Sequence, residues 1–354
     1  MMRAQLARFF PADTLEFWGR HVDPLFAVGR VLARVETVQS ETARVRTVVL
    51  RPNAAWRGFR AGQHVVLTVE VDGRRLSRTF SLSGAEDAGT LRLTIGRQPG
   101  GRVTGWIHER LRPGAVVELS QAHGDFTLPD DPGVPVLLIA GGTGVTPFLA
   151  MLRTLAARGA RRDVVLLCYA PRAEELIARV DLAGLAAAAP GLRVYPAYTR
   201  ETRADALAGH FGAPHLAVAA PDYRERLTYV CGPETLMGAV ERHWQDANLA
   251  GELRREWFAP PRPAAGAARG PAAVTCTDSG RTVTVPGERS LLEELEAAGL
   301  RPRHGCRAGI CRQCTCLKAS GAVEELRTGR MGDEDGEPIQ LCAVRAAGDL
   351  VLAL

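Results

Sequence analysis

The sequence predicts a multidomain protein with three folded parts: an antiparallel β-barrel, an α/β domain built on a parallel sheet, and a small α+β domain. Short alternating strands separated by turns run through residues 31–128, a pattern typical of an antiparallel barrel. At residues 136–140 a continuous apolar run leads into glycines and a helical stretch, as in a buried parallel strand that feeds a helix. A segment rich in Pro, Ala and Gly at residues 259–272 predicts a semi-stiff linker before the last part of the chain.

The barrel is expected to follow a lead-in at residues 1–30. Alternating apolar residues predict barrel strands at residues 47–50, 64–69 and 91–95. The lead-in is partly helical, with Asp13 at the position of an N-cap, and it carries the aromatic residues Phe9, Phe10, Phe17 and Trp18. We expect it to pack against the barrel; docking to a partner or to a membrane surface is the alternative.

The α/β domain is expected over residues 129–258 and the α+β domain over residues 273–354. In the former, apolar runs predict a helix at residues 147–156 and strands at residues 136–140, 164–169, 192–195 and 227–231. In the latter, we expect a strand pair around Gly280, a helix at residues 291–298 and a last strand at residues 350–352.

Composition excludes several classes of function. The net charge is +5 over 354 residues, and arginines are scattered among acids without a basic run, so nucleic-acid binding is not expected. No stretch approaches the ~18 apolar residues of a membrane span, and the N-terminus is not a secretory signal. The eight cysteines suggest the reducing cytoplasm rather than a disulfide scaffold. We expect a cytoplasmic monomer without a transmembrane segment, peripheral to a membrane only through a partner.

Four cysteines near the C-terminus have the spacing C-x4-C-x2-C…C by which plant-type ferredoxins hold a [2Fe–2S] cluster. The expected ligands are Cys306, Cys311, Cys314 and Cys342. Glycines between them let backbone N–H groups turn toward an anionic cluster. Of the other cysteines, Cys168 and Cys276 are expected in hydrophobic cores, and Cys316 as a neighbour of the cluster rather than a ligand.

The barrel contains a string, Arg78-Thr79-Phe80-Ser81, that resembles the R-x-[YF]-[ST] flavin motif of the ferredoxin–NADP reductase superfamily. An arginine fork suits a pyrophosphate, and a serine hydroxyl can reach the flavin N5 region. The family usually has tyrosine where this chain has Phe80, so one hydroxyl bond to the cofactor is missing. Three further strings match the family in order: Gly62-Gln63, Gly100-Gly101-Arg102-Val103-Thr104 and Gly124-Asp125-Phe126-Thr127-Leu128. The resemblance implies FAD, with FMN as the alternative, held by Gln63, Arg78, Thr79, Phe80, Ser81, Gly100, Gly101, Val103 and Thr104.

The α/β domain carries strings that resemble the family's pyridine-nucleotide motifs. The loop Gly141-Gly142-Thr143-Gly144-Val145-Thr146-Pro147 follows the first buried strand, where glycines let a dinucleotide approach the strand end. In the family the thiol of C-G-P, here Cys231-Gly232-Pro233, lies beside the nicotinamide, so Cys231 joins Ser81 as a candidate catalytic residue. Thr199-Arg200-Glu201 resembles an element that holds the 2′-phosphate of NADPH; Arg200, with Arg203 beside it, favours NADPH over NADH. Glu256-Trp257-Phe258 resembles a closing element of related oxidoreductases, in which Phe258 would contact the flavin.

The resemblance therefore implies a reductase that passes electrons from NAD(P)H through FAD to the [2Fe–2S] cluster and on to a protein partner. Strings such as His21-Val22-Asp23-Pro24-Leu25 most resemble bacterial reductases of fatty-acyl desaturases. The main alternative is the reductase component of a ring-hydroxylating or other oxygenase. A third hypothesis is a redox-sensing regulatory module. It is disfavoured because the flavin and nucleotide motifs are complete. Basic residues such as Arg307 and Arg312 are expected to raise the potential of the cluster.

Overall fold

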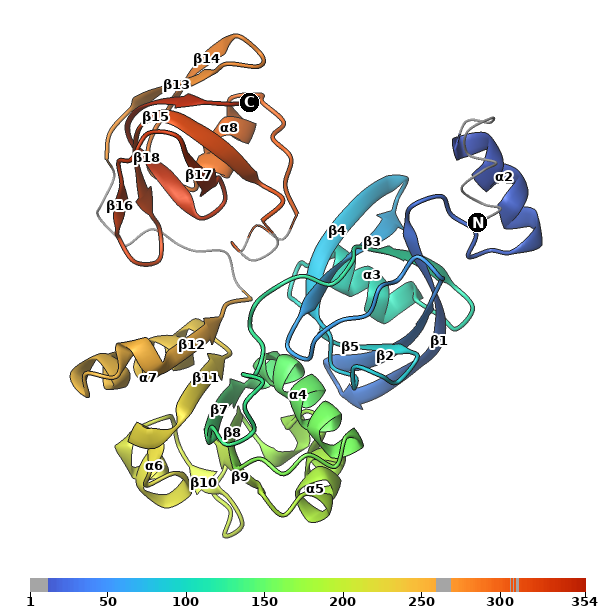
Figure 1. Cartoon of the computed structure of the whole chain (residues 1–354), viewed down its shortest axis with the longest axis vertical. Coiled ribbons are helices and arrows are strands. Elements are labelled where there is room, and N and C mark those ends of the chain that lie inside the picture. The colour runs from blue at the N-terminus through green and yellow to red at the C-terminus, as the bar shows by residue number, and fades with distance from the viewer. Residues whose placement is uncertain (1–11, 259–268, 306, 308, 310–311) are drawn as a thin grey trace. The chain divides into compact units, whose positions relative to one another are not determined.

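The structure, a computed structural model, describes residues 12–258, 269–305, 307, 309 and 312–354. It consists of two compact units, Met1–Glu256 and Trp257–Leu354 (Figure 1). The first contains the barrel and the parallel sheet, and the second contains the α+β domain. Each unit is described separately below.

The barrel part of the first unit is a six-stranded sheet in the order β4-β3-β6-β1-β2-β5, with every pairing antiparallel. Its core consists of alternate residues of these strands, such as Val48 and Leu50, together with Ile107 of helix α3 (Arg102–Arg110). This confirms the predicted antiparallel architecture. The strands are β1 (Val31–Thr42), β2 (Val45–Pro52), β3 (His64–Val71), β4 (Arg74–Ser81), β5 (Leu91–Gly96) and β6 (Val116–Leu119).

The second sheet of this unit is parallel throughout, in the order β10-β9-β8-β7-β11-β12. All residues of β7 and β8 are buried, as expected of strands covered on both faces. The strands are β7 (Val136–Gly141), β8 (Val164–Ala170), β9 (Leu192–Tyr198), β10 (Leu207–Ala208), β11 (Leu227–Cys231) and β12 (Leu253–Glu256). The helices are η1 (Gly142–Val145), α4 (Thr146–Ala157), η2 (Ala173–Glu175), α5 (Arg179–Ala188), α6 (Ala213–Ala219), η3 (Tyr223–Glu225), α7 (Glu234–Asp246) and η4 (Ala250–Glu252).

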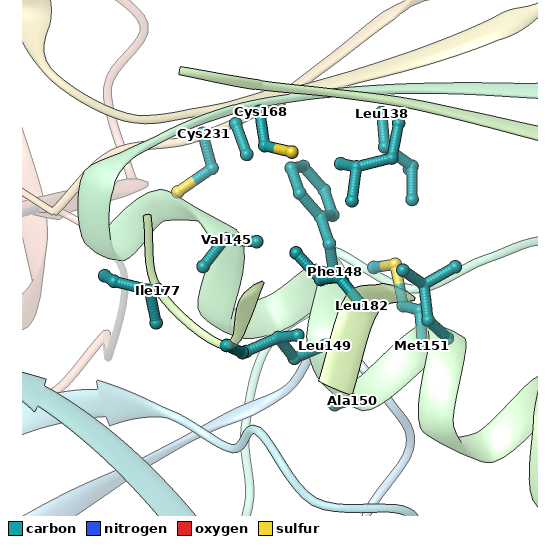
Figure 2. Packing of buried hydrophobic residues seen from close by; sticks show 14 of the residues in the cluster. Leu138, Val145, Phe148, Leu149, Ala150, Met151, Cys168, Ile177, Leu182 and Cys231 are labelled. Atoms are coloured by element: carbon teal, nitrogen blue, oxygen red, sulfur yellow. The ribbon is translucent and has the colours of Figure 1, made fainter. Parts of the chain in front are cut away.

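The hydrophobic core of this sheet lies directly beneath the nucleotide motifs. Figure 2 shows Cys231 near Val145, and Cys168 beside Phe148 of α4. Cys168 lies in this core, as the sequence predicts, and burial raises the pKa of its thiol to about 12. The loop between β7 and α4 is therefore packed against this core through Val145.

Polar contacts join the barrel to the parallel sheet. Arg153 of α4, which is largely buried, donates to the Ser83 carbonyl oxygen of the barrel and to Asp181 of α5. The backbone N–H of Glu86 donates to the Thr154 hydroxyl at 3.1 Å, and the Glu86 carboxylate pairs with Arg158 at 2.6 Å. Because arginine forks hold geometry well, these contacts fix one sheet against the other.

The lead-in differs from the sequence prediction. Helix α2 (Ala12–Val22) is attached through Glu16, which pairs with Arg30 and accepts from the Val28 N–H. Phe17 and Trp18 do not pack against the barrel: 60% and 66% of their surfaces are exposed. Asp13 lies inside the helix rather than at its cap, and Phe9 and Phe10 lie outside the described residues. The prediction that this segment packs against the barrel is wrong for its two described aromatic residues, because an ion pair holds the helix instead.

The second unit is a mixed sheet in the order β14-β13-β18-β15-β16, with β17 also paired to β15. Helix α8 (Leu291–Ala297) packs on it and is capped by Ser290, whose hydroxyl accepts from the Glu293 N–H. Cys276 lies in its core, as predicted. The arrangement confirms the predicted α+β class. The strands are β13 (Ala272–Cys276), β14 (Arg281–Val285), β15 (Thr315–Glu325), β16 (Met331–Gly332), β17 (Glu337–Gln340) and β18 (Val344–Leu352).

Lys318 of β15, the only lysine in the sequence, is completely buried in this unit. Its Nζ donates to the carbonyl oxygens of Gly321, Gly332 and Glu334 at 2.6–3.2 Å and pairs with Glu337. A buried ammonium is tolerated because all of its donors are used. Within the part of the chain that the structure describes, no helix is long and apolar enough to span a membrane.

Candidate functional site: a junction of flavin and nucleotide motifs

The two glycine-containing nucleotide motifs interlock at the carboxyl ends of β7 and β11. A Cβ on Gly144 would overlap the carbonyl oxygen of Cys231, and a Cβ on Gly141 would lie 2.7 Å from Cδ of Pro233. These two glycines are therefore required by the packing of one motif on the other. Gly142 is different: its φ is +52°, and a Cβ there would meet no atom within 4 Å. Gly142 thus faces open space, where a ligand can approach.

The flavin motif meets these nucleotide motifs through Glu256, the last residue of β12. Register places Glu256 opposite Cys231 on the neighbouring strand β11. Its Oε2 accepts a hydrogen bond of 3.1 Å from the hydroxyl of Ser81, the last residue of β4. All three side chains are buried, with exposed fractions of 5% or less. The two candidate catalytic residues, Ser81 and Cys231, are therefore brought together from different sheets.

The environment of Cys231 keeps its thiol neutral. Burial raises the pKa of Cys231 well above its ordinary value, and the negative charge of Glu256 raises it further. A thiolate nucleophile is therefore excluded at neutral pH. The arrangement suits a thiol that packs against a bound ring or donates a weak hydrogen bond.

The closing element contributes a residue that the sequence prediction did not name as part of the site, Glu256, which accepts a hydrogen bond from Ser81. Phe258, the residue named from this element, is 39% exposed, and its contact with the flavin stays a prediction. Glu256 is the first residue of the same closing element, but its place beside Cys231 depends on the pairing of β12 with β11, which no short string records. His64, the first residue of β3, was also missed; it lies opposite Ser81 in register and 3.7 Å from Glu256.

Strand β4 presents the remaining flavin-motif side chains. Arg78 is exposed and Phe80 is partly buried against the barrel core. The buried Oγ1 of Thr79 has no hydrogen-bond partner among the described residues. Because a buried hydroxyl without a partner is costly, this orphaned atom fits a ligand with a polar group at that position.

Other predicted flavin residues already have partners within the protein. The Gln63 side chain donates to the Gly124 carbonyl oxygen at 2.9 Å and accepts from the Arg60 N–H. The Thr104 hydroxyl accepts from the Gln98 N–H at 3.1 Å, and Val103 is buried in the barrel core. The side chains of Gln63 and Thr104 are thus hydrogen-bonded within the protein, and that of Val103 belongs to its core.

The N-terminus of α3 is open for an anion. Gly101 occupies the N-cap position and provides no side-chain cap, and the first turn contains no acidic residue. The amide groups of this turn therefore lack side-chain acceptors and suit a phosphate. Together with Thr79 and the Arg78 guanidinium, this helix end fits the pyrophosphate of FAD.

At the far end of the nucleotide sheet, basic side chains gather at the ends of β8 and β9. Arg200 and Arg172 are exposed, and no side chain of the described residues pairs with either guanidinium. The Arg200 N–H donates to the Pro171 carbonyl oxygen at 2.9 Å, so the two arginines leave neighbouring strand ends. Arg203 is instead paired with Asp205 at 2.8 Å, and Thr199 contributes its backbone N–H to Ala170. Sequence reasoning missed Arg172, whose place beside Arg200 depends on strand order.

Two of the four predicted cluster ligands are described, and they lie together. The Sγ atoms of Cys314 and Cys342 are 3.3 Å apart, and the Gly309 N–H donates to Cys342 Sγ at 3.2 Å. Two adjacent buried sulfurs with an inward amide fit an iron–sulfur centre. Cys306 and Cys311 lie outside the described residues. Cys316, the next cysteine along β15, is buried, and burial raises the pKa of its thiol to about 12.

Arg307, one of the basic residues of the cluster loop, has an acidic partner within the protein. Arg307 makes a bidentate ion pair with Glu296 of α8, at 2.6 and 2.7 Å, and this pair raises the pKa of Arg307. A paired arginine adds little net positive charge. The ion pair holds the loop at Arg307, where φ is +60°. The effect of Arg307 on the cluster potential stays a prediction.

Three parts of the chain match known protein families. Residues 30–128 match the family described as an oxidoreductase FAD-binding domain, and residues 138–242 match an oxidoreductase NAD-binding domain. Residues 274–347 match a 2Fe–2S iron–sulfur cluster binding domain. The protein is thus an NAD(P)H-dependent flavin and iron–sulfur oxidoreductase, with FAD, NAD(P)H and a [2Fe–2S] cluster as its cofactors.

Relatives that match over most of this chain show the family to which it belongs. The NADPH oxidoreductase of Mycobacterium tuberculosis is 34% identical over 335 residues, which cover 93% of this chain and 86% of the relative. The glycine betaine monooxygenase reductase subunit of Pseudomonas aeruginosa is 30% identical over 352 residues, covering 92% and 96%. The solved structure of phthalate dioxygenase reductase has the same fold, with a TM-score of 0.60 over 91% of this chain and 97% of that chain, at 24% identity. The chain belongs to the ferredoxin–NADP reductase superfamily, among its members with a C-terminal [2Fe–2S] domain.

Proposed function

We propose that this protein passes electrons from NADPH through FAD and the [2Fe–2S] cluster to an oxygen-activating iron enzyme. The observation that carries the proposal is the junction at Glu256, where Ser81 of the flavin motif and Cys231 of the nucleotide motif converge. A hydride can pass only between rings held in contact, and this junction is where the two motifs meet. FAD, when bound, supplies the change from two-electron to one-electron transfer.

The chain's own residues would bind and orient these groups. The FAD phosphates would be held by the first-turn amides of α3 together with Arg78, Thr79, Gly100 and Gly101. Phe80 would lie beside the flavin ring system. Gly142 and Thr143, at the start of η1, would face the dinucleotide. Ser81 would position the reacting edge of the flavin, and the neutral Cys231 thiol would pack against the nicotinamide. Cys306, Cys311, Cys314 and Cys342 would hold the cluster.

Preference for NADPH is supported by the unpaired Arg200 and Arg172, because a guanidinium binds the 2′-phosphate that NADH lacks. Arg200→Ala is expected to raise the KM for NADPH about 10- to 100-fold and to leave the KM for NADH within about twofold, because a charge-assisted bond contributes roughly 1.5–3 kcal/mol. Steady-state ferricyanide reduction with each nucleotide measures this. Arg203→Ala is the matched control, since Arg203 is already paired with Asp205. Equal effects on NADPH and NADH in Arg200→Ala would contradict the assignment.

For the electron acceptor, we propose a fatty-acyl desaturase. Short strings near the N-terminus resemble desaturase reductases, and the exposed aromatic side chains of α2, Phe17 and Trp18, suit a partner at a membrane. A ring-hydroxylating or other oxygenase is the second candidate. It is favoured by the relative from Pseudomonas aeruginosa, which is named as a reductase subunit of a monooxygenase.

An acceptor experiment separates the two candidates. The purified holoprotein and NADPH would be combined either with membranes that contain a di-iron fatty-acyl desaturase and a saturated acyl thioester, or with a soluble Rieske oxygenase and its aromatic substrate. We expect unsaturated product in the first mixture, measured by mass spectrometry, and at least about tenfold less turnover in the second. Hydroxylated product in the second mixture alone would assign the protein to an oxygenase system.

A further inference from the structure

Helix α4 contacts the barrel beside the flavin motifs and begins inside the nucleotide loop. Its first residue is Thr146, and its Met151, labelled in Figure 2, lies against the string Gly62-Gln63. A Cβ on Gly62 would come within 2.7 Å of the Met151 Cε atom. Arg153, two residues further along α4, contacts the chain that follows the flavin motif on β4. A shift of α4 against the barrel would therefore move the nucleotide loop relative to the flavin motif.

The guanidinium of Arg153 binds groups from two different parts of this unit. Its Nη1 donates to the carbonyl oxygen of Ser83, two residues after Ser81. Its Nε and Nη2 lie 2.8 and 2.6 Å from Oδ2 of Asp181, in the first turn of α5. The Arg153 side chain is only 12% exposed. Because the guanidinium is planar and its donors have fixed directions, it holds both partners at a defined spacing.

The backbone at Ser83 is itself held firmly on β5. Ser83 is completely buried, and its N–H donates to the Arg92 carbonyl oxygen at 2.8 Å. Its hydroxyl donates to the same carbonyl oxygen at 3.1 Å and lies 3.0 Å from Oγ1 of Thr94. A Cβ on Gly84 would come within 3.2 Å of the Arg92 Cβ atom. The contact with Arg153 is therefore made to a fixed point of the barrel, close along the chain to Ser81.

Stability alone does not account for a guanidinium at this place. Burial lowers the pKa of Arg153, and the negative charge of Asp181 opposes this effect. Replacing a buried ion pair by well-packed apolar side chains is often neutral or stabilising, so a fold needs no arginine here. Arg153 offers what an apolar side chain lacks, a directional bond between the end of the flavin motif and the nucleotide domain.

We propose that Arg153 is a positioning residue for hydride transfer, because its guanidinium fixes helix α4 and the nucleotide loop against the chain that follows Ser81. The inference rests on the proposed function, in which the flavin lies beside Ser81 and the dinucleotide at the loop. Hydride transfer requires the two rings at a defined distance and angle, and a misplacement of about 1 Å can cost roughly 100-fold in rate. Arg153 touches neither ring and acts through the two motifs that hold them.

The test uses two variants of Arg153 in the holoprotein. Arg153→Met keeps the length of the side chain and removes every donor, whereas Arg153→Lys keeps the charge without the planar fork. Arg158→Met is the matched control on the same helix. Arg158 pairs with Glu86 and Asp87 of the barrel, but it is 51% exposed, and exposed ion pairs contribute little.

Three quantities would be measured. Anaerobic stopped-flow absorbance gives the rate of flavin reduction at saturating NADPH and the long-wavelength charge-transfer absorbance of the complex. Titration with NADP⁺ gives its dissociation constant. Thermal unfolding and flavin content show that each variant is folded and loaded.

For Arg153→Met we expect flavin reduction about tenfold slower or more, weaker charge-transfer absorbance, and a dissociation constant for NADP⁺ within about twofold of wild type. Arg153→Lys should lie between this variant and wild type, with a loss of about threefold. Arg158→Met should keep all three quantities within about twofold. A merely structural role of Arg153 would lower the unfolding temperature without changing the charge-transfer absorbance of the folded, loaded protein.

Several outcomes would overturn the inference. Arg153 has no positioning role if the loaded Arg153→Met protein keeps the wild-type reduction rate and charge-transfer absorbance, and the reductase function then stands. An equal loss in Arg158→Met, or a rise in the NADP⁺ dissociation constant that matches the loss of rate, also contradicts it. If Arg153→Met does not fold with FAD, Arg153→Lys decides by the same readouts. If the wild type does not reduce ferricyanide with NADPH, the proposed function itself fails.

Discussion

Cys342→Ser is expected to abolish electron delivery through the cluster while leaving the flavin half active. Cys342 is buried, lies 3.3 Å from Cys314 by their sulfurs, and accepts from the Gly309 N–H. Loss of a thiolate ligand should remove the [2Fe–2S] absorbance and lower cytochrome c reduction at least ~100-fold. Ferricyanide reduction by NADPH should stay within about twofold, because this acceptor takes electrons directly from the flavin.

Cys316→Ser is the matched control for this experiment. Cys316 is also buried, lies two residues from Cys314, and has a thiol whose pKa burial raises to about 12. We expect this variant to retain the cluster and cytochrome c reduction. Equal loss of ferricyanide and cytochrome c activities in Cys342→Ser would instead show that electrons do not follow the order from flavin to cluster.

Gly144→Ala is expected to have the second large effect, on nucleotide binding. The added methyl group would overlap the Cys231 carbonyl oxygen, which is backbone and cannot rotate away. The two motifs must then move apart, at a cost of about 1–3 kcal/mol. We expect the KM for NADPH to rise about tenfold or more and flavin reduction to slow, as measured by stopped-flow absorbance at the flavin band.

Gly184→Ala provides the control in the same domain. Gly184 lies in the exposed part of α5, and a Cβ there would meet no atom within 4 Å. Alanine is favoured over glycine in a helix by up to about 1 kcal/mol, so this variant should be as stable as the wild type or more so. If Gly144→Ala bound NADPH as tightly as Gly184→Ala does, the proposed role of this loop would be wrong.

The sequence by itself determined the fold classes and the cofactors. Alternation of apolar residues predicted the antiparallel barrel, and the apolar run at β7 predicted the parallel sheet, because burial on one face or on two leaves different periodicities. The flavin, nucleotide and cysteine motifs are local strings, since a loop that holds a phosphate or a cluster needs its glycines and ligands at fixed spacing. The family matches confirm the predicted cofactors, FAD, NAD(P)H and a [2Fe–2S] cluster.

Only the tertiary structure decided which side chains meet. Glu256 joins Ser81, 175 residues away, because β12 ends beside β11 and the barrel is fixed against the parallel sheet. His64 enters the same cluster through its register with Ser81, and Arg172 joins Arg200 through the order of β8 and β9. Strand order and sheet-on-sheet packing are non-local, so no short string records them. For the same reason, the sequence indicated a loop of glycines for NADPH, whereas the structure shows that Gly141 and Gly144 first serve the packing of that loop on Cys231 and Pro233.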